Sequence, residues 1–331
     1  MIGFCLAAGA GSRLAPLTRA VPKPLLAPAG RPLLELACVA LEKAGAERVV
    51  VNVHHGADAL TAYLAGRPGV EVAHEPVLLG TGGGLAAARR AGLLGSGDDT
   101  VVVTSADHVL DPADVAMVGA ALRRHGAPAA MGVGAGRWPP PFRLDGDRAV
   151  PDPDGPWTAA GVFAVRAALL DQLEQGYSEL VDAVLEPCWR RGDLLGVPMR
   201  GPWADAGTLS RFLAVSAGLL RGRWPYPLPA GRLLTGDWAD EAGATAAGPV
   251  FLAAGVVLEP GALLVGPVVL DAGSSVEAGA VVTRAVVGPG ASVGARATVT
   301  GSVLGPGARA AAGTITTAAL LPPGPAAGGI G

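Results

Sequence analysis

The sequence of 331 residues is poor in several residue types, and each shortage narrows what the protein can be. Only 16% of the residues are charged and the net charge is −3, so no broad basic surface is expected for nucleic acid or an anionic membrane. The three cysteines, Cys5, Cys38 and Cys188, are far apart and lack the spacing of a metal site or a disulfide framework. This usage fits a reducing compartment, and we expect a cytoplasmic protein with neither nucleic acid nor membrane as partner.

Long hydrophobic runs are missing as well. No run of about 18 apolar residues indicates a membrane span. The N-terminal stretch is apolar but lacks a basic region and is interrupted by glycines, so it is expected to be a buried strand and not a signal peptide. Half of the residues are nevertheless hydrophobic, which is enough for a sizeable core, and the length allows about two domains.

Lysine is the scarcest charged residue, because Lys23 and Lys43 are the only two in the chain. Lys23 stands between two prolines, shortly after Gly9, Gly11 and Arg13. The two glycines let a ligand approach the backbone closely, and N–H groups at a following helix start favour an anion. Arg13 and Lys23 add positive charge suited to phosphate oxygens. The opening stretch therefore predicts a phosphate cradle.

The same stretch reads Gly-Ala-Gly-Ser-Arg-Leu-Ala-Pro-Leu-Thr over residues 9–18 and Pro-Lys-Pro-Leu over residues 22–25. It resembles the signature of the sugar-1-phosphate nucleotidyltransferases (nucleotide-sugar pyrophosphorylases), G-x-G-x-R-L-x-P-L-T followed by P-K-P-L. The resemblance implies catalytic roles for Arg13 and Lys23. It implies nucleotide binding by Ala8, Gly9, Gly11 and Ser12. The alternative interpretation is a structural turn with unrelated basic residues.

Strand and helix patterns alternate through the first two thirds of the chain. Strands are predicted at 2–6, 46–53, 70–74, 100–104 and 195–199, and helices at 32–44, 57–64, 85–94 and 209–220. This alternation predicts an α/β fold with a Rossmann-like, mostly parallel sheet covered on both faces. Ligands of such sheets bind at the carboxyl ends of the strands.

A second glycine loop, predicted over residues 80–84, follows the strand at 70–74. It resembles the Leu-Gly-Thr-(Ala/Gly)-Gly segment that holds the base and the sugar in the same family. A planar base can lie against backbone where Cβ atoms are missing. The resemblance implies nucleotide contacts by Gly80, Thr81, Gly82 and Gly83, and a flexible turn is the alternative.

Two aspartates follow predicted strands, Asp107 in Ser-Ala-Asp and Asp205 in Trp-Ala-Asp-Ala-Gly-Thr. The resemblance implies that both ligate Mg²⁺, although the family usually has Asn-Gly or Gly before the first of them. Mg²⁺ is commonly held by one or two carboxylates together with substrate phosphates. Two helix N-caps are the alternative interpretation.

We expect the strand around residues 157–163 to form the part of the site that binds the sugar. The resemblance implies sugar contacts by Thr158 and Gly161. Glu179 lies where relatives carry an acidic sugar contact, close to Asp182, and a surface helix is the alternative there. The family's Glu-Lys-Pro is absent. Arg143 is our candidate for the sugar phosphate, although arginine and lysine differ in how they bind phosphate.

Beyond residue 248 the pattern changes to a period of six. The sequence predicts a nucleotidyltransferase domain over 1–222, a connector over 223–248, a hexapeptide-repeat parallel β-helix over 249–319 and a loose tail over 320–331. The resemblance implies a left-handed β-helix, as in proteins similar to mannose-1-phosphate guanylyltransferases. The repeated aliphatic residues are Leu252, Leu258, Leu264, Leu270, Val276 and Val282, and after one slip Val287, Val293 and Val299.

The resemblance implies an enzyme that converts a nucleoside triphosphate and a sugar 1-phosphate into a nucleotide sugar and pyrophosphate with Mg²⁺. The substrate class stays open between GDP-mannose-type and UDP-sugar-type hexose 1-phosphates. A homo-oligomer formed through the β-helix is expected. One alternative is a catalytically silent regulatory subunit that binds nucleotide sugar. A hexapeptide acyltransferase is disfavoured, because such enzymes use a histidine on the β-helix and none follows His125.

Overall fold

The computed structural model describes residues 1–136 and 141–324, which form two compact units. Within the described residues, unit 1 comprises residues 1–9, 34–136 and 141–204, and unit 2 comprises residues 10–33 and 205–324. These units cut across the domain boundaries expected from the sequence, which remain predictions. Among the described helices, none is both long and apolar enough to cross a membrane.

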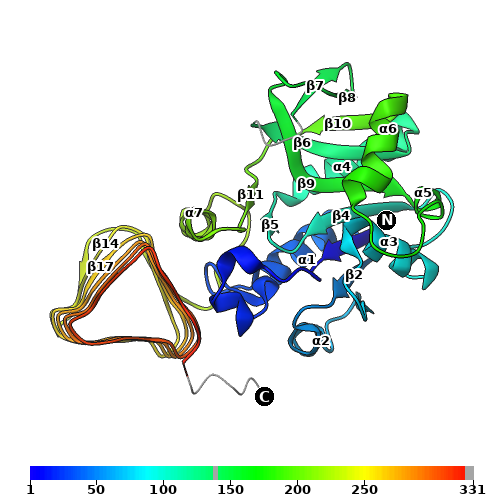
Figure 1. The fold of residues 1–331 in the computed structure, drawn as a ribbon. Coiled ribbons are helices and arrows are strands. Elements are labelled where there is room, and N and C mark those ends of the chain that lie inside the picture. Colours follow the sequence, from blue (N-terminus) through cyan, green and yellow to red (C-terminus); the bar gives the residue numbers. More distant parts are fainter. Residues whose placement is uncertain (137–140, 325–331) are drawn as a thin grey trace. The chain divides into compact units, whose positions relative to one another are not determined.

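Unit 1 contains a nine-stranded sheet with the order β3-β2-β1-β4-β9-β6-β10-β8-β7 (Figure 1). β1 pairs in parallel with β2 and β4, β2 pairs in parallel with β3, and β6 pairs in parallel with β10. β9 lies antiparallel between β4 and β6. The strands are β1 (Ile2–Leu6), β2 (Arg48–Val53), β3 (Val70–His74), β4 (Thr100–Ser105), β6 (Ala129–Ala135), β7 (Phe142–Asp145), β8 (Arg148–Pro151), β9 (Trp157–Arg166) and β10 (Leu194–Pro198).

Helices cover both faces of this sheet, as the alternation in the sequence predicts. Gly3 of β1 packs directly on Leu41 of α1 (Leu33–Lys43), and Val102 of β4 lies against Gly119 of α4 (Pro112–His125). Because neighbouring residues of a strand point to opposite faces, Phe4 of β1 belongs to the other layer. That layer forms a core with α3 (Gly80–Arg90), α5 (Ala167–Leu170), the π-helical turn η4 (Val181–Leu185) and α6 (Glu186–Arg191).

Local signals fix several helix ends. Asp111 caps α4 by accepting a hydrogen bond from the Ala113 N–H, and Gly126 ends this helix at φ 65°. The remaining helix of unit 1, α2 (Ala57–Leu64), coincides with its predicted range. α3 does not, because it begins at Gly80 and not at Leu85. The glycines predicted as a loop therefore form the first turns of a helix.

Unit 2 contains α7 (Leu209–Leu220) and stacked coils of short parallel strands. The coils form three sheets that are parallel from β14, β15 and β16 onward, as expected of the predicted left-handed β-helix, whereas β12 and β13 pair antiparallel with β15 and β14. Figure 1 shows the three-sided outline of the coils. The repeated residues from Leu264 to Val299 point inward and are fully buried. The strands are β12 (Gly231–Leu234), β13 (Trp238–Ala239), β14 (Thr245–Ala247), β15 (Val250–Ala253), β16 (Val257–Leu258), β17 (Leu263–Val265), β18 (Val268–Leu270), β19 (Ser275–Val276), β20 (Val281–Thr283), β21 (Val286–Val287), β22 (Ser292–Val293), β23 (Thr298–Thr300), β24 (Val303–Leu304), β25 (Arg309–Ala310), β26 (Ile315–Thr317) and β27 (Leu320–Leu321).

The slip in the six-residue repeat is visible in the pairing. Phe251 pairs with Val269, whereas Val269 pairs with Val286, so the coil shortens by one residue. The last strand, β27, pairs with β24 and belongs to the stack. The coil therefore continues two residues into the segment expected to be a loose tail, and residues 325–331 of that segment lie outside the described residues.

Candidate functional site

In the predicted phosphate cradle, Gly11 lies in unit 2 against Thr18 and Lys23, which follow it in the sequence. Gly11 has φ +62°, and a Cβ atom there would lie 2.7 Å from Cβ of Lys23. The Thr18 hydroxyl donates a hydrogen bond of 3.0 Å to the Gly11 carbonyl. Only a glycine fits this close approach in a left-handed conformation. The fold thus brings Gly11, Thr18 and the buried Lys23 together, and their role in phosphate binding stays a prediction.

The helix start expected after Gly11 is only the 3₁₀ turn η1 (Ser12–Leu14). Two more 3₁₀ turns follow, η2 (Leu17–Arg19) and η3 (Lys23–Leu25). The prolines at 16, 22 and 24 lack the N–H groups that a continuous helix needs, which explains the interruption. Arg13 and Ser12 are exposed on the first turn. Anion binding by a helix dipole is therefore not available here, and the guanidinium and the backbone N–H groups remain.

The second predicted carboxylate, Asp205, has several close neighbours in unit 2. It lies in β11 (Ala204–Asp205), and its Oδ1 accepts a 2.9 Å hydrogen bond from the Gly207 N–H. Its Oδ2 accepts from Nη1 of Arg211 at 2.6 Å. A Cβ atom on Gly207 would lie 2.7 Å from this carboxylate and 2.8 Å from Nη2 of Arg13. Arg13 and Asp205 therefore flank the same glycine.

Sequence reasoning missed Arg211. It stands in the first turn of α7, six residues after Asp205, and Thr208 caps that helix through a hydrogen bond from the Arg211 N–H. A capping Thr predicts the start of a helix here, but it gives no signal that the arginine would pair with the preceding carboxylate. Each carboxylate oxygen of Asp205 has a second lone pair, so its ion pair with Arg211 leaves acceptor capacity for a cation.

The first predicted carboxylate, Asp107, follows β4 in unit 1 and is 19% exposed. Its Oδ1 lies 3.0 Å from Nδ1 of His108, which opens the short strand β5 (His108–Val109). The imidazole ring packs on Gly161 of β9, where φ is +80° and a Cβ atom would lie 2.2 Å from the ring. Thr104 also donates a hydrogen bond to the Gly161 carbonyl. Gly161, predicted as a sugar contact, thus makes room for the histidine beside Asp107.

The predicted nucleotide-binding glycines of α3 make close contacts within unit 1. A Cβ atom at Gly80 would lie 2.5 Å from the Ser178 carbonyl oxygen, and one at Gly83 would lie 2.3 Å from that of Gly176. The N–H groups of Gly82 and Gly83 both donate to the Ser178 carbonyl. The missing side chains therefore admit residues 176–179 of the chain itself. A nucleotide role for these glycines stays a prediction.

Thr81 and Glu179, predicted for the nucleotide and the sugar, contact each other. The Thr81 hydroxyl donates to Oε2 of Glu179 at 2.7 Å, and the Tyr177 hydroxyl donates to its Oε1. Burial disfavours the charged carboxylate, but these hydrogen bonds outweigh it and hold the pKa of Glu179 below its ordinary value. Glu179 is therefore a fixed anion at the start of α3.

The other two predicted sugar residues differ in exposure. Thr158 is buried on β9 beside Gly136, whereas Arg143 on β7 is 48% exposed. The guanidinium of Arg143 lies 3.7 Å from Asp145 and 3.5 Å from Asp152. These carboxylates compete with a phosphate for Arg143, so the structure adds no support to its proposed role.

A buried polar pair, Asn52 and Glu75, was also missed. Both residues are 2% exposed, and they connect the carboxyl ends of β1, β2 and β3. The Asn52 amide donates to Oε1 of Glu75 at 2.7 Å and accepts from the Ala7 N–H at 2.8 Å. Oε2 of Glu75 accepts from the Leu79 N–H. The sequence signal for this pair is an Asn inside a Val-rich strand. A buried amide needs hydrogen-bond partners, so such an Asn indicates a polar contact within the core.

Carboxylate oxygens of the predicted aspartates suit a hard divalent cation, but the described side chains do not form a complete metal site. Among residues 1–136 and 141–324, no three side chains of His, Cys, Asp or Glu converge as a preformed metal site. The chemistry of Asp107 in unit 1 and of Asp205 in unit 2 suits such a cation, and their role as metal ligands stays a prediction.

Comparison with known proteins gives one family match and two similar sequences. A model of the MobA-like NTP transferase domain matches residues 3–184. N-acetylmuramate alpha-1-phosphate uridylyltransferase of Neisseria meningitidis is 32% identical over 248 residues, covering 68% of this chain and all of the relative. Mannose-1-phosphate guanylyltransferase of Mycobacterium tuberculosis is 32% identical over 270 residues, covering 76% of this chain and 73% of the relative.

A solved structure supports the fold. A putative glucose-1-phosphate thymidylyltransferase from Bacillus anthracis aligns with a TM-score of 0.57 and 20% identity, covering 67% of this chain and 96% of that one.

Proposed function

Because the chain belongs to the MobA-like NTP transferase family, we propose that it joins a nucleoside triphosphate to a sugar 1-phosphate and releases pyrophosphate. The observation that carries this proposal is that Arg13 and Asp205 both lie against Gly207. This closeness supports a site in which a cation suited to phosphate acts beside a carboxylate suited to a metal. Names of the relatives support nucleotidyl transfer to a sugar 1-phosphate, and we propose a hexose 1-phosphate of the GDP-mannose or UDP-sugar type.

In the proposed reaction, an oxygen of the sugar phosphate attacks the α-phosphorus in line. The bond from that phosphorus to the bridging oxygen breaks, and pyrophosphate carries the electron pair away. The attacking phosphate is already ionised at neutral pH, so no general base is needed. The protein then acts by positioning the substrates and by stabilising charge.

We assign the charge-stabilising roles to the cations of the opening stretch. Arg13 is exposed and has a planar guanidinium, which suits the leaving pyrophosphate. Lys23 is 8% exposed and is held against Gly11, which suits a fixed charge near the α-phosphate or the sugar phosphate. Asp107 and Asp205 would hold a divalent cation, which we propose to be Mg²⁺. The cation would supply charge neutralisation between the two phosphate groups.

The experiment that tests this proposal is a matrix of four nucleoside triphosphates against a panel of hexose 1-phosphates with Mg²⁺. Pyrophosphate release by the purified chain in at least one combination is the expected result. It would also exclude a catalytically silent subunit. In that combination Arg13→Ala should lower turnover by at least about 100-fold, whereas Arg19→Ala on the next exposed turn should leave it near the wild-type value. Near-normal turnover of Arg13→Ala would contradict the assignment.

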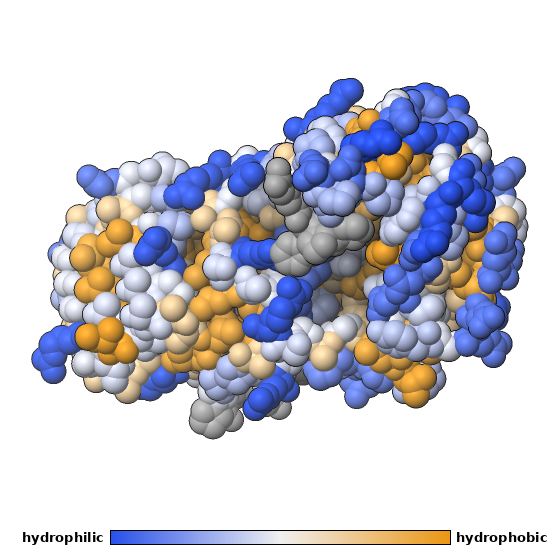
Figure 2. Space-filling view, turned by 45° about the horizontal axis from the view of Figure 1, so that its top comes forward, coloured by the Kyte–Doolittle hydropathy of each residue, from blue (hydrophilic) through white to orange (hydrophobic). Residues whose placement is uncertain are grey.

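We further propose that the chain forms a homo-oligomer through the β-helix. The outward side chains of the β17, β20, β23 and β26 sheet are aliphatic residues and threonines, without a charge. Leu263, Val265 and Ile315 are exposed there. Figure 2 shows apolar and neutral residues widely spread over the visible face of the β-helix. The mass in solution should exceed that of one chain, and Leu263→Glu should lower it.

The location proposed from cysteine usage is the cytoplasm. Cys5, Cys38 and Cys188 are all free thiols and all buried. This is the pattern of a protein that neither needs nor forms disulfides.

A further inference from the structure

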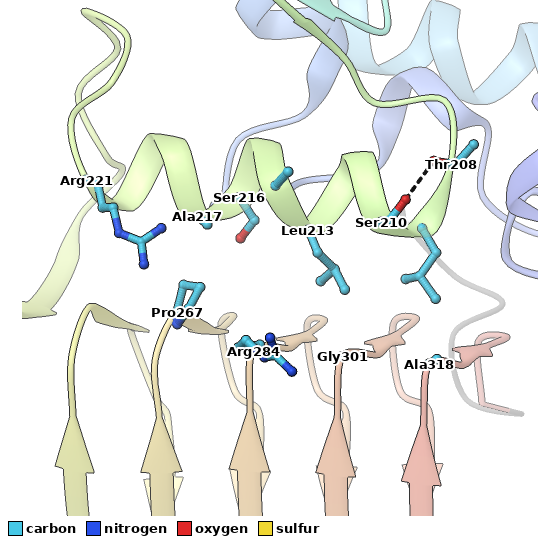
Figure 3. Close-up of a pocket in the computed structure, with 12 residues that line it drawn as sticks. Thr208, Ser210, Leu213, Ser216, Ala217, Arg221, Pro267, Arg284, Gly301 and Ala318 are labelled. Atoms are coloured by element: carbon cyan, nitrogen blue, oxygen red, sulfur yellow. Dashed lines mark hydrogen bonds between the residues drawn. The ribbon is translucent and has the colours of Figure 1, made fainter.

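A cleft of about 650 Å³ lies in unit 2, between α7 and one corner of the β-helix (Figure 3). Its volume falls within the range of small-molecule pockets, roughly 300–1,000 Å³. Leu209, Leu213, Ala214 and Ala217 form an apolar wall on the helix side. None of the residues proposed above for nucleotide, sugar or metal lines it.

The opposite wall is one corner column of the β-helix. It consists of Pro267, Arg284, Gly301 and Ala318, which turn the same corner in successive coils. The coil loses one residue of its repeat at Arg284. From there on, this corner of each coil contains one residue fewer. Arg284, Gly301 and Ala318 turn it with φ of 46°, 56° and 50°. Arg284 is the only one of the four with a charged side chain.

Two arginines give the cleft its charge. Arg221 follows the last residue of α7, and its guanidinium points into the cleft together with that of Arg284 (Figure 3). Neither guanidinium forms an ion pair with another residue in the described part of the chain. No carboxylate lines the cleft, whereas the hydroxyls of Ser210 and Ser216 do. An arginine at the end of a helix also complements its dipole, but that explanation does not extend to Arg284.

We propose that this cleft binds a small organic anion. Its apolar body would pack on Leu209, Leu213 and Pro267, and its carboxylate, phosphate or sulfonate group would lie between Arg221 and Arg284. Apolar walls with a few polar groups that fix orientation are the usual composition of ligand sites. Arg211 in the first turn of the same helix binds Asp205, so an occupant would contact the helix that positions a proposed metal ligand.

The test uses 8-anilinonaphthalene-1-sulfonate, a fluorescent probe with an apolar body and one anionic group, titrated into the full chain. Saturable binding with one site per chain is expected. Arg284→Ala and Arg221→Ala should each raise the dissociation constant at least about tenfold. Arg284→Ala should fold, because Ala318 holds the same corner at φ 50°. Circular dichroism melting would verify this.

Arg296→Ala is the matched control. Arg296 is a second β-helix arginine with positive φ (57°), and it does not line the cleft. Its alanine variant should bind the probe like the wild type. N-phenyl-1-naphthylamine, which lacks the sulfonate, should show no dependence on Arg284 or Arg221. Absence of saturable binding, equal affinity of the wild type and both cleft variants, or displacement of the probe by a nucleoside triphosphate would overturn the proposal. These outcomes are read by fluorescence, so they are independent of catalysis.

Discussion

The side-chain amide of Asn52 donates a hydrogen bond of 2.7 Å to the carboxylate of Glu75, and both groups are buried at the carboxyl edge of the sheet. Through the Ala7 and Leu79 N–H groups, this pair connects the end of the first strand with the segment that enters α3. Gly84 of α3 packs directly on the pair, because a Cβ atom there would lie 2.4 Å from Oε1 of Glu75. The pair thus links the two glycine-containing motifs of the sequence.

Replacing Asn52 with Ala should lower the free energy of unfolding by about 1–3 kcal/mol, because buried polar groups lose their hydrogen-bond partners. Urea denaturation monitored by circular dichroism measures this change. Glu71→Ala is a suitable control, because Glu71 forms an exposed ion pair with Arg48 on the neighbouring strand. Exposed pairs contribute about 0–1 kcal/mol. Equal stability of Asn52→Ala and the wild type would show that the pair is dispensable.

Replacing Gly161 with Ala should destabilise the protein by at least about 1 kcal/mol, because a positive φ is strained for residues with a Cβ atom. The new methyl group would also overlap the ring of His108 and displace it from Asp107. Adding His108→Ala removes the overlap but not the backbone strain. The double variant should therefore recover part of the stability lost by Gly161→Ala, as measured in thermal melts. A double variant no more stable than Gly161→Ala would argue against the overlap.

Removal of divalent metal with EDTA should abolish pyrophosphate release, and added Mg²⁺ should restore it. Asp107→Asn and Asp205→Asn should each lower turnover by at least about 100-fold and raise the Mg²⁺ concentration needed for half-maximal rate. Both effects follow from loss of a charged cation ligand. Asp98→Asn is the control, because Asp98 is 93% exposed and pairs with Arg166. Unchanged Mg²⁺ dependence of either variant would show that the replaced aspartate is not a ligand of the metal.

The carboxylate of Glu179 should make stability depend on pH in the acid range. Its pKa is lower in the folded protein than the ordinary value of 4.5. The folded state therefore gains stability from the charged form, fully so above about pH 4.5, and loses it as the pH falls through the folded pKa. The wild type should exceed Glu179→Gln in unfolding free energy at pH 7, and the difference should shrink below pH 4.5. If the difference in unfolding free energy between the wild type and Glu179→Gln did not change with pH, Glu179 would not be stabilised in its charged form.

Much of the fold was readable from the sequence, because it rests on local patterns. Alternating strands and helices predict a parallel sheet, and β1, α2, β3 and α7 have the predicted bounds. The period of six predicts a β-helix, because one coil stacks its aliphatic residues on the next. The helix at Gly80 was missed because glycine has a low intrinsic helix propensity. The first turn of this helix is held by contacts with residues 176–179, which are distant in the sequence.

The sequence by itself determined which residue types serve the proposed chemistry, since Arg13, Lys23 and the two aspartates stand in recognisable local motifs. Only the tertiary structure decided their neighbours. It placed Arg211 on Asp205, His108 between Asp107 and Gly161, and Arg284 in a cleft beneath α7. Such contacts depend on register, helix orientation and coil stacking, which set side chains from distant segments within a few ångströms of one another. A linear motif carries no information about these distances.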